Sequence, residues 1–184
     1  MSDVLFTDGH AGRLAVHRWD PAEPQRIVVL AHGYGEHAGR YEHVADRLTA
    51  DGALVVAPDH AGHGRSDGER ALIEDLERLV DDLAAVGAAV LAERPGLPVA
   101  LVGHSLGAIV ATRLAQRGDL PVLWLHGEED ALAPLVHAEP AVAGLGAASV
   151  ERHVYPGAQH EVLNETHRDE VIAVLVDFVR RTTA

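Results

Sequence analysis

The stretch PVALVGHSLGAIVATRLAQRGDLPVLWLHGEED, residues 98–130, decides the fold. It begins and ends with short aliphatic runs, residues 98–103 and 121–127, which are typical of strands buried on both faces. A tight glycine-flanked turn and a helical segment lie between them. This order predicts a strand, a sharp turn, a helix and a second strand, which is one repeat of an α/β architecture.

The rest of the chain continues the same alternation. Residues 26–31 and 53–57 are further apolar strands, residues 149–155 form a more polar edge strand, and residues 5–19 form an N-terminal hairpin. Apolar residues at helical spacing mark helices over 76–90 and 171–179. The sequence therefore predicts a single α/β domain over residues 1–184, with a mostly parallel sheet and helices on both faces.

Composition excludes several classes of function. The chain has 184 residues, no cysteine and a formal net charge of −13. Absence of cysteine excludes disulfides and thiolate metal sites, and the negative charge disfavours nucleic acid and anionic membranes as partners. The first ten residues show no secretory signal, and no apolar run approaches the roughly 20 residues of a membrane span. We therefore expect a cytoplasmic protein with no stable membrane anchor.

Three residues form a candidate catalytic triad. Ser105 lies in the pattern Gly-His-Ser-Leu-Gly between a buried strand and a helix, which is the setting of a nucleophile elbow. Asp130 follows the strand 121–127, and His160 follows the strand 149–155, in the chain order that such triads need. Glu128 and Glu129 are rival acids. The pattern predicts acyl chemistry with Ser105 as the nucleophile.

The glycine-rich segment 31–41, AHGYGEHAGRY, follows another strand and is a candidate oxyanion-binding loop. We expect the backbone N–H groups of Tyr34 and Leu106 to stabilise the negative charge of the intermediate. An ordinary glycine-rich turn is the alternative interpretation. His60 and His63 form a candidate metal site with Glu36 or Asp59 as a third ligand.

Five motifs together resemble the monoacylglycerol lipases, α/β-hydrolases that are also described as serine aminopeptidase S33 or hydrolase 4 proteins. The motifs are HGYGEHAGRYEHVADRL, APDHAGHGRSDGER, GHSLGA, HGEED and YPGAQHEVLNE. The resemblance implies the same triad and oxyanion hole, and places Glu36 and Arg40 at the polar end of the pocket, where the glycerol moiety leaves. Taken alone, this pair is more often a simple ion pair. The resemblance also implies that the segment with His60 and His63 is a structural loop, so we expect no metal and no cofactor. His104, within the elbow, is expected to be a packed residue.

The stretch between the elbow helix and residue 121 is too short for that family. One core strand and the helical cap have no residues to encode them, so the resemblance implies an uncapped active site with an exposed apolar face that includes Ile109. We expect short esters to be accepted at least as well as long monoacylglycerols, with self-association through this face as a possible interaction. We also expect the strand at 121–127 to pair directly with that at 98–103, with the Asp130–His160 contact preserved.

The predicted function is therefore a carboxylic-ester hydrolase that acts through an acyl-enzyme on a small ester or monoacylglycerol. A thioesterase, a lysophospholipase or a peptidase on the same triad is an alternative, because the fold does not fix the substrate. A further alternative from a different class is a non-catalytic scaffold that keeps the triad residues only in its sequence.

Overall fold

The computed structural model describes residues 2–116, 121–145 and 149–184, which form two compact units. Unit 1 comprises Met1–Leu114 with Thr183, and unit 2 comprises Ala115–Thr182 with Ala184. Each unit is described by itself below. The prediction of a single domain over residues 1–184 stays a prediction.

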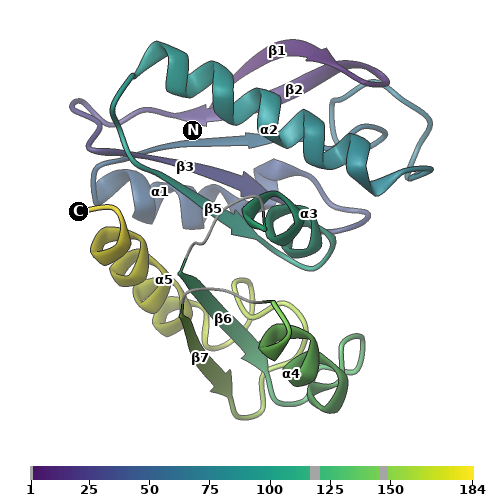
Figure 1. Ribbon diagram of the computed structural model, residues 1–184, viewed down its shortest axis with the longest axis vertical. Helices are drawn as coiled ribbons and strands as arrows, with labels where there is room; N and C mark the ends of the chain where they lie inside the picture. Colours follow the sequence, from purple (N-terminus) through teal and green to yellow (C-terminus); the bar gives the residue numbers. More distant parts are fainter. Residues whose placement is uncertain (1, 117–120, 146–148) are drawn as a thin grey trace. The chain divides into compact units, whose positions relative to one another are not determined.

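Unit 1 contains the longer part of the α/β alternation (Figure 1). Its elements are β1 (Asp3–Gly9), β2 (Gly12–Trp19), β3 (Arg26–Ala31), the short helix η1 (Ala38–Tyr41), α1 (Glu42–Ala50), β4 (Ala53–Pro58), α2 (Leu76–Glu93), β5 (Val99–Gly103) and most of α3 (Leu106–Ala115). The strands and the helix α2 agree with the sequence prediction. Helix α1 was not predicted.

Five strands form the sheet of unit 1 in the order β1-β2-β4-β3-β5. The N-terminal hairpin is antiparallel, as predicted, and β2 joins β4 antiparallel. Strand β3 lies between β4 and β5 and is parallel to both, with Ile27 opposite Leu54 and Val99. The carboxyl ends of β3, β4 and β5 therefore meet at one edge of the sheet.

Helices cover both faces of this sheet, which explains why β3 and β4 are buried at every position (Figure 1). Ile27 and Val29 pack with Leu83 and Val86 of α2 in the main hydrophobic core. The alternate residues of β3 point to the other face, where α1 lies. Each α/β repeat thus places its loop at the edge where the strands end.

Unit 2 consists of β6 (Val122–Gly127), α4 (Leu135–Ala143), β7 (Val150–Tyr155) and α5 (Arg168–Thr182). Strands β6 and β7 are parallel, with Val122 opposite Val150 and Gly127 opposite Tyr155. Helix α5 buries an apolar face made of Val171, Ile172, Leu175 and Val179. Both strands end at the same edge, so the loops that follow them lie close together.

The expected pairing of β6 with β5 would join a strand of unit 2 to a strand of unit 1, and it stays a prediction. Within the described residues, β5 pairs with β3 and β6 pairs with β7, in separate sheets. The junction at residues 117–120, from which that expectation was drawn, lies outside the described residues.

Candidate active site

The backbone of Ser105 has the conformation that a nucleophile elbow requires. Its φ is 52°, in a region that residues with a side chain seldom adopt. Glycines on both sides make this turn possible. A Cβ atom on Gly103 would lie 2.3 Å from the carbonyl oxygen of Gly107, and one on Gly107 would lie 2.0 Å from that of Ala31. The turn is thus pressed against β3, and its strain points to a functional role for Ser105.

The elbow also places Ser105 at the start of α3. Its carbonyl oxygen accepts hydrogen bonds from the N–H groups of Ala108 at 2.9 Å and Ile109 at 3.2 Å. Leu106 is the first residue of α3, and N–H groups in the first turn of a helix have no partner within that helix. The positive end of the helix therefore favours negative charge beside Ser105. The side chain of Ile109 is 53% exposed, which confirms the prediction of its exposure.

The predicted oxyanion loop is held by the carboxylate of Glu36. This side chain is 9% exposed. Its Oε2 atom accepts two hydrogen bonds, from the Gly33 N–H at 2.8 Å and from the Tyr41 hydroxyl at 2.7 Å. The same oxygen lies 3.5 Å from Nδ1 of His104, the residue before the nucleophile. Glu36 therefore links the loop directly to the elbow.

The charge of Glu36 is stabilised by these contacts. Burial alone raises the pKa of its carboxyl, but the hydrogen bonds from His104, Tyr41 and Gly33 outweigh burial and lower the pKa to about 2. Arg40 also forms an ion pair with Glu36, as one interpretation of the sequence had it, and its side chain is 37% exposed. Tyr34 is 59% exposed, and its hydroxyl donates to the Ala71 carbonyl at 3.0 Å.

Asp130 and His160 form the second part of the candidate site, in unit 2. Oδ2 of Asp130 lies 2.8 Å from Nδ1 of His160, so the predicted contact is present. The other oxygen accepts the N–H groups of Leu132 and Ala133, each at 2.9 Å. Burial raises the pKa of Asp130, but hydrogen bonds from Ala133 and His160 outweigh burial and hold the pKa below its ordinary value. Glu128 and Glu129 are exposed, whereas Asp130 is buried.

Two residues that sequence reasoning missed hold the loop of His160. Oxygens of Glu165 accept the N–H groups on both sides of His160, from Gln159 at 2.7 Å and from Glu161 at 2.6 Å. A Cβ atom on Gly127 would lie 1.9 Å from the carbonyl oxygen of Gln159, so only glycine allows this loop to approach the end of β6. Glu165 and Gly127 both lie in motifs that carry the family resemblance, and this was the one sign in the sequence that they matter.

The histidine cluster under the loop is a packed structure. The rings of His32 and His60 lie 4.3 Å apart, and those of His32 and His63 lie 5.5 Å apart. His32 accepts the N–H of His60 at 2.9 Å through Nε2, and its Nδ1 lies 2.7 Å from the carbonyl oxygen of Gly33. Burial lowers the pKa of His32 to about 4 and that of His60 to about 3. Across the described ranges, no group of three or more potential ligands could hold a metal ion.

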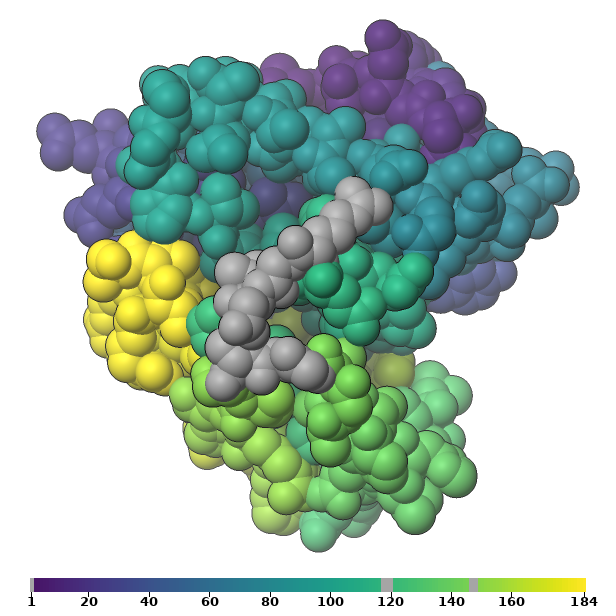
Figure 2. Space-filling model, viewed as in Figure 1, coloured from purple at the N-terminus to yellow at the C-terminus, as the bar shows by residue number. Residues whose placement is uncertain are grey.

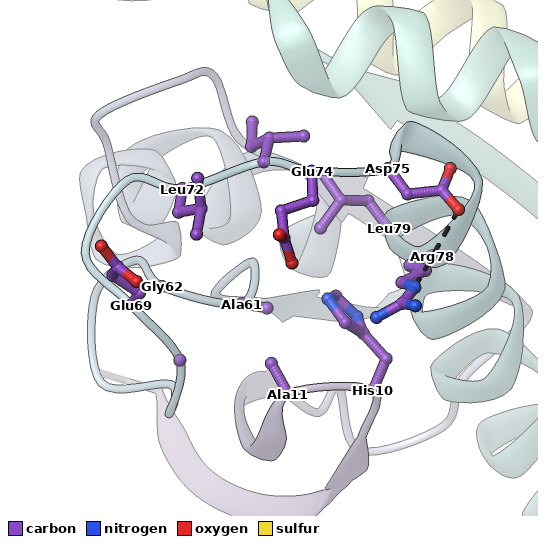
Figure 3. A pocket seen from close by; sticks show the side chains of 12 residues that line it. His10, Ala11, Ala61, Gly62, Glu69, Leu72, Glu74, Asp75, Arg78 and Leu79 are labelled. Atoms are coloured by element: carbon purple, nitrogen blue, oxygen red, sulfur yellow. Dashed lines mark ion pairs between the residues drawn. The ribbon is translucent and has the colours of Figure 1, made fainter.

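A pocket of about 270 Å³ lies elsewhere in unit 1 and contains none of the predicted site residues (Figure 3). It is lined by the β1–β2 turn and the segment that leads into α2, which adjoin each other on the surface (Figure 2). Two of its lining side chains lie near carboxylates. His10 contacts Asp82 at 2.7 Å, and Arg78 lies 3.9 Å from Asp75.

The predicted site residues thus fall into two groups. Ser105, Leu106, Tyr34, Glu36 and Arg40 belong to unit 1, and Asp130 and His160 belong to unit 2. The structure brings Glu36 and Arg40 together, and likewise Asp130 and His160. None of the helices in the described part of the chain combines the length and apolar character that a membrane span needs.

The sequence profile described as serine aminopeptidase, S33 matches residues 22–119 and 115–167. The chain belongs to this family. The match in two pieces, which meet at residues 115–119, is what a chain without an internal segment of its S33 relatives produces.

Relatives of known name lie within the same family. The monoacylglycerol lipase of Mycolicibacterium smegmatis is 40% identical over 150 residues, which cover 78% of this chain and 54% of the lipase. The human monoglyceride lipase is 38% identical over 128 residues, which cover 68% of this chain and 40% of that protein. The chain therefore spans about half the length, or less, of these S33 relatives.

Solved structures show the α/β-hydrolase fold. A thermostable carboxyl esterase from Bacillus coagulans, solved with glycerol, has a TM-score of 0.89 at 17% identity and covers 100% of this chain and 99% of its own. An α/β serine hydrolase without lid from Xanthomonas campestris has a TM-score of 0.82 at 22% identity and covers 98% and 94%, respectively. The predicted fold class is confirmed for this S33 chain.

Proposed function

We propose that the chain is a serine hydrolase that cleaves carboxylic esters through an acyl-enzyme. The observation that carries this proposal is the left-handed backbone of Ser105, held between two glycines that have no room for a side chain. Such strain persists where the position of a side chain matters for chemistry. Membership of the S33 family and the lipase relatives support hydrolysis as the reaction class.

In the proposed reaction, His160 accepts the proton of the Ser105 hydroxyl while the oxygen attacks the ester carbonyl carbon. The N–H groups of Tyr34 and Leu106 stabilise the resulting oxyanion. The C–O bond to the alcohol then breaks, and the alcohol leaves with the proton from His160. Water repeats the sequence on the acyl-enzyme and releases the acid. Asp130, ionised and hydrogen-bonded to Nδ1, holds the tautomer and stabilises the imidazolium.

The polar end of the site is assigned to Glu36 and Arg40. The Glu36 carboxylate already accepts hydrogen bonds from Gly33 and Tyr41, so its main effect is to position the loop. The Arg40 guanidinium is more exposed and is the better candidate for contact with the hydroxyl groups of a leaving alcohol such as glycerol. The proposed substrates are small esters and monoacylglycerols.

A non-catalytic scaffold is the second candidate function. It is favoured by one observation, namely that the nucleophile and the Asp130–His160 pair belong to different compact units of a chain that spans about half of its relatives' length. Thioester and peptide hydrolysis remain open on the same residues.

Labelling with a fluorophosphonate probe and hydrolysis of p-nitrophenyl butyrate test the proposal. We expect the wild-type chain to be labelled and active. Ser105→Ala should abolish labelling and reduce kcat by a factor of about 10⁴ or more, and Asp130→Asn should reduce kcat by about 10⁴. The matched control is Ser149→Ala, because Ser149 is exposed and lies outside the elbow.

Labelling that survives Ser105→Ala, or a folded wild-type chain that reacts with neither reagent, would overturn the assignment. The second result would favour the scaffold.

A further inference from the structure

The turn at residues 69–72 is strained at a residue that is not glycine. The φ of Ala71 is 57°, and in the described part of the chain Ser105 is the only other non-glycine residue with a positive φ. Left-handed backbone is disfavoured for alanine, because its Cβ lies too close to the carbonyl oxygen that follows. Such a conformation persists where the surrounding structure holds it, and it is concentrated at functional sites. The contacts of Ala71 show what the conformation achieves.

Hydrogen bonds to a neighbouring loop hold this turn in place. The N–H of Ala71 donates to the Gly62 carbonyl at 3.1 Å, and the N–H of Leu72 donates to the Glu69 carbonyl at 3.2 Å. A Cβ atom on Gly62 would lie 2.2 Å from the carbonyl oxygen of Glu69, so the turn and the loop are in direct contact. With the turn held in this way, the Ala71 carbonyl accepts a hydrogen bond from the Tyr34 hydroxyl at 3.0 Å.

A second contact fixes the ring of Tyr34. Its centroid lies 5.6 Å from that of His63 at an interplanar angle of 72°, which is the edge-to-face geometry that aromatic rings favour. His63 is buried, and its Nδ1 lies 3.0 Å from the carbonyl oxygen of Ala61. The side chain of Tyr34 is itself exposed, so burial does not hold it. The bond to Ala71 and the contact with His63 thus restrict a side chain that would otherwise sample several rotamers.

The peptide between Gly33 and Tyr34 carries the N–H that the proposed oxyanion hole uses. In the described residues this N–H donates to no protein group, as an oxyanion donor requires. The carbonyl oxygen of the same peptide lies 2.7 Å from Nδ1 of His32, which holds the Gly33 end. Gly35 follows with a φ of 74° and with no atom within 4 Å of an added Cβ, so it adds little restraint. The side chain of Tyr34 is therefore the group that fixes the other end of the peptide.

We propose that the phenol of Tyr34 is a positioning group for the oxyanion hole, anchored by its hydrogen bond to the strained carbonyl of Ala71. This inference rests on the proposed function. Donors stabilise an oxyanion most strongly when they are held in place before the charge develops, because no reorganisation is then needed. The anchor keeps the Tyr34 N–H in one direction in the free enzyme. It acts on the transition state more than on the bound ester, whose carbonyl oxygen carries much less negative charge.

Tyr34→Phe removes the hydroxyl and keeps the ring that contacts His63. We expect kcat for p-nitrophenyl butyrate to fall roughly tenfold, which is less than the factor of about 10² for loss of a donor, because the N–H itself remains. KM should change by less than about twofold. The matched control is Tyr155→Phe, because the Tyr155 hydroxyl has no hydrogen-bond partner within the described residues. This control should retain both kcat and KM.

Substitutions of Ala71 test the role of the strained carbonyl. Valine is β-branched and tolerates a positive φ poorly, so Ala71→Val should turn the carbonyl away from Tyr34 and reduce kcat by a similar factor. Ala71→Gly keeps the left-handed backbone without steric cost and should retain kcat. The double variant Tyr34→Phe/Ala71→Val should be no slower than either single variant, because both changes remove the same hydrogen bond. A double variant slowed by the product of the two single effects would overturn the proposed anchor.

A butyl trifluoromethyl ketone measures the oxyanion hole directly. Its carbonyl carbon bonds to Oγ of Ser105, the hydroxyl proton passes to His160, and the ketone oxygen becomes the oxyanion. The affinity of Tyr34→Phe for this ketone should fall by the same factor as kcat/KM. A merely structural role for the phenol would instead lower the fraction of active chain, counted by fluorophosphonate labelling, and leave the affinity of the remaining chain unchanged.

Amide hydrogen exchange tests the anchor without any use of activity. The N–H of Ala71 should exchange about threefold or more faster in Tyr34→Phe than in the wild type, because the turn loses one of its restraints. Tyr155→Phe should leave this rate unchanged. An equal rate in Tyr34→Phe and the wild type would show that the phenol does not hold the turn, and would overturn the proposal.

The outcomes separate this role from the proposed function. An active wild type in which Tyr34→Phe keeps its kcat, or in which only KM rises, would overturn the positioning role and leave the proposed function intact. A folded wild type that is neither labelled nor active would refute the proposed function and this role with it, even if the exchange of Ala71 responds to Tyr34→Phe.

Discussion

Replacement of Glu36 by glutamine removes one charge from the centre of the oxyanion loop. The depression of the pKa from 4.5 to about 2 corresponds to about 3 kcal/mol at 1.36 kcal/mol per pKa unit, and partial screening by solvent reduces this to about 2 kcal/mol. The hydrogen bonds from Gly33 and Tyr41 lead to a stabilising free energy of the same order of magnitude, since bonds to charged groups contribute roughly 1.5–3 kcal/mol each. We therefore expect Glu36→Gln to lower the free energy of unfolding by about 2 kcal/mol at pH 7.

The pH dependence of this loss follows from its sign. The folded-state pKa of Glu36 is depressed, so the stabilisation is complete above the unfolded pKa of 4.5 and is lost as the pH falls through about 2. The difference between wild type and Glu36→Gln should shrink to roughly half or less of its neutral value at pH 3.

Urea titrations followed by the fluorescence of Trp19 measure the loss in unit 1. This side chain is 5% exposed, and a Trp124→Phe background removes the tryptophan of unit 2. The control Glu23→Gln removes an exposed carboxylate from the same unit and should change stability by less than about 0.5 kcal/mol. A loss of less than about 0.5 kcal/mol for Glu36→Gln, or an equal loss at pH 7 and pH 3, would refute the reasoning.

Three further predictions concern the elbow, the histidines and the substrate. Gly107→Ala should destabilise the chain by about 1–3 kcal/mol in thermal unfolding, because the added Cβ would lie 2.0 Å from a backbone atom. The control Gly87→Ala should be neutral or stabilising by up to about 1 kcal/mol, because its Cβ would meet one methyl group at 3.5 Å. Equal effects of the two substitutions would contradict the elbow geometry. Because the pKa values of His32 and His60 are lowered in the folded chain, the unfolded chain binds protons at a higher pH, and stability should fall as the pH drops from 6.5 towards about 3. His60→Gln should make stability depend less on pH in urea titrations at stepped pH. An unchanged dependence would show that these rings do not control the stability in this range. Without a cap, p-nitrophenyl butyrate should have a kcat/KM at least equal to that of the palmitate ester, since each methylene out of contact loses about 0.8 kcal/mol of binding. A strong preference for palmitate would show that another surface of the protein holds the acyl chain.

Local patterns predicted most of the elements. Burial leaves a pattern in the sequence of the strand or helix itself. It shows as apolar runs in β3 and β4 and as helical spacing of Leu79, Leu83 and Val86 in α2. Helix α4 escaped prediction because Pro140 interrupts its pattern and it buries no residue. Helix α1 has the apolar spacing of a helix, with Val44, Ala45 and Leu48 buried, but it follows the glycine-rich loop without a capping side chain.

Contacts between distant segments were harder to foresee. The sequence order sufficed for the Asp130–His160 contact, because parallel strands bring their loops together. The sequence favoured Asp130 over its glutamate neighbours, and the structure distinguishes them by burial at the turn after β6. The pairing of β5 with β6 joins the two units and stays a prediction. The roles of Glu36 and Glu165 depend on which N–H groups surround each carboxylate, which no spacing rule contains.

The clamp of Glu165 on the loop of His160 has an evolutionary consequence. The proposed general base His160, the proposed orienting acid Asp130 and the groups that hold both are encoded within β6, β7 and the loops that follow these strands. The hydrogen bonds of Asp130 with Leu132, Ala133 and His160, and those of Glu165 with Gln159 and Glu161, join residues that all follow β6 in the chain. A gene rearrangement that exchanges the residues between α3 and β6 therefore leaves these particular hydrogen bonds encoded in one uninterrupted stretch of sequence.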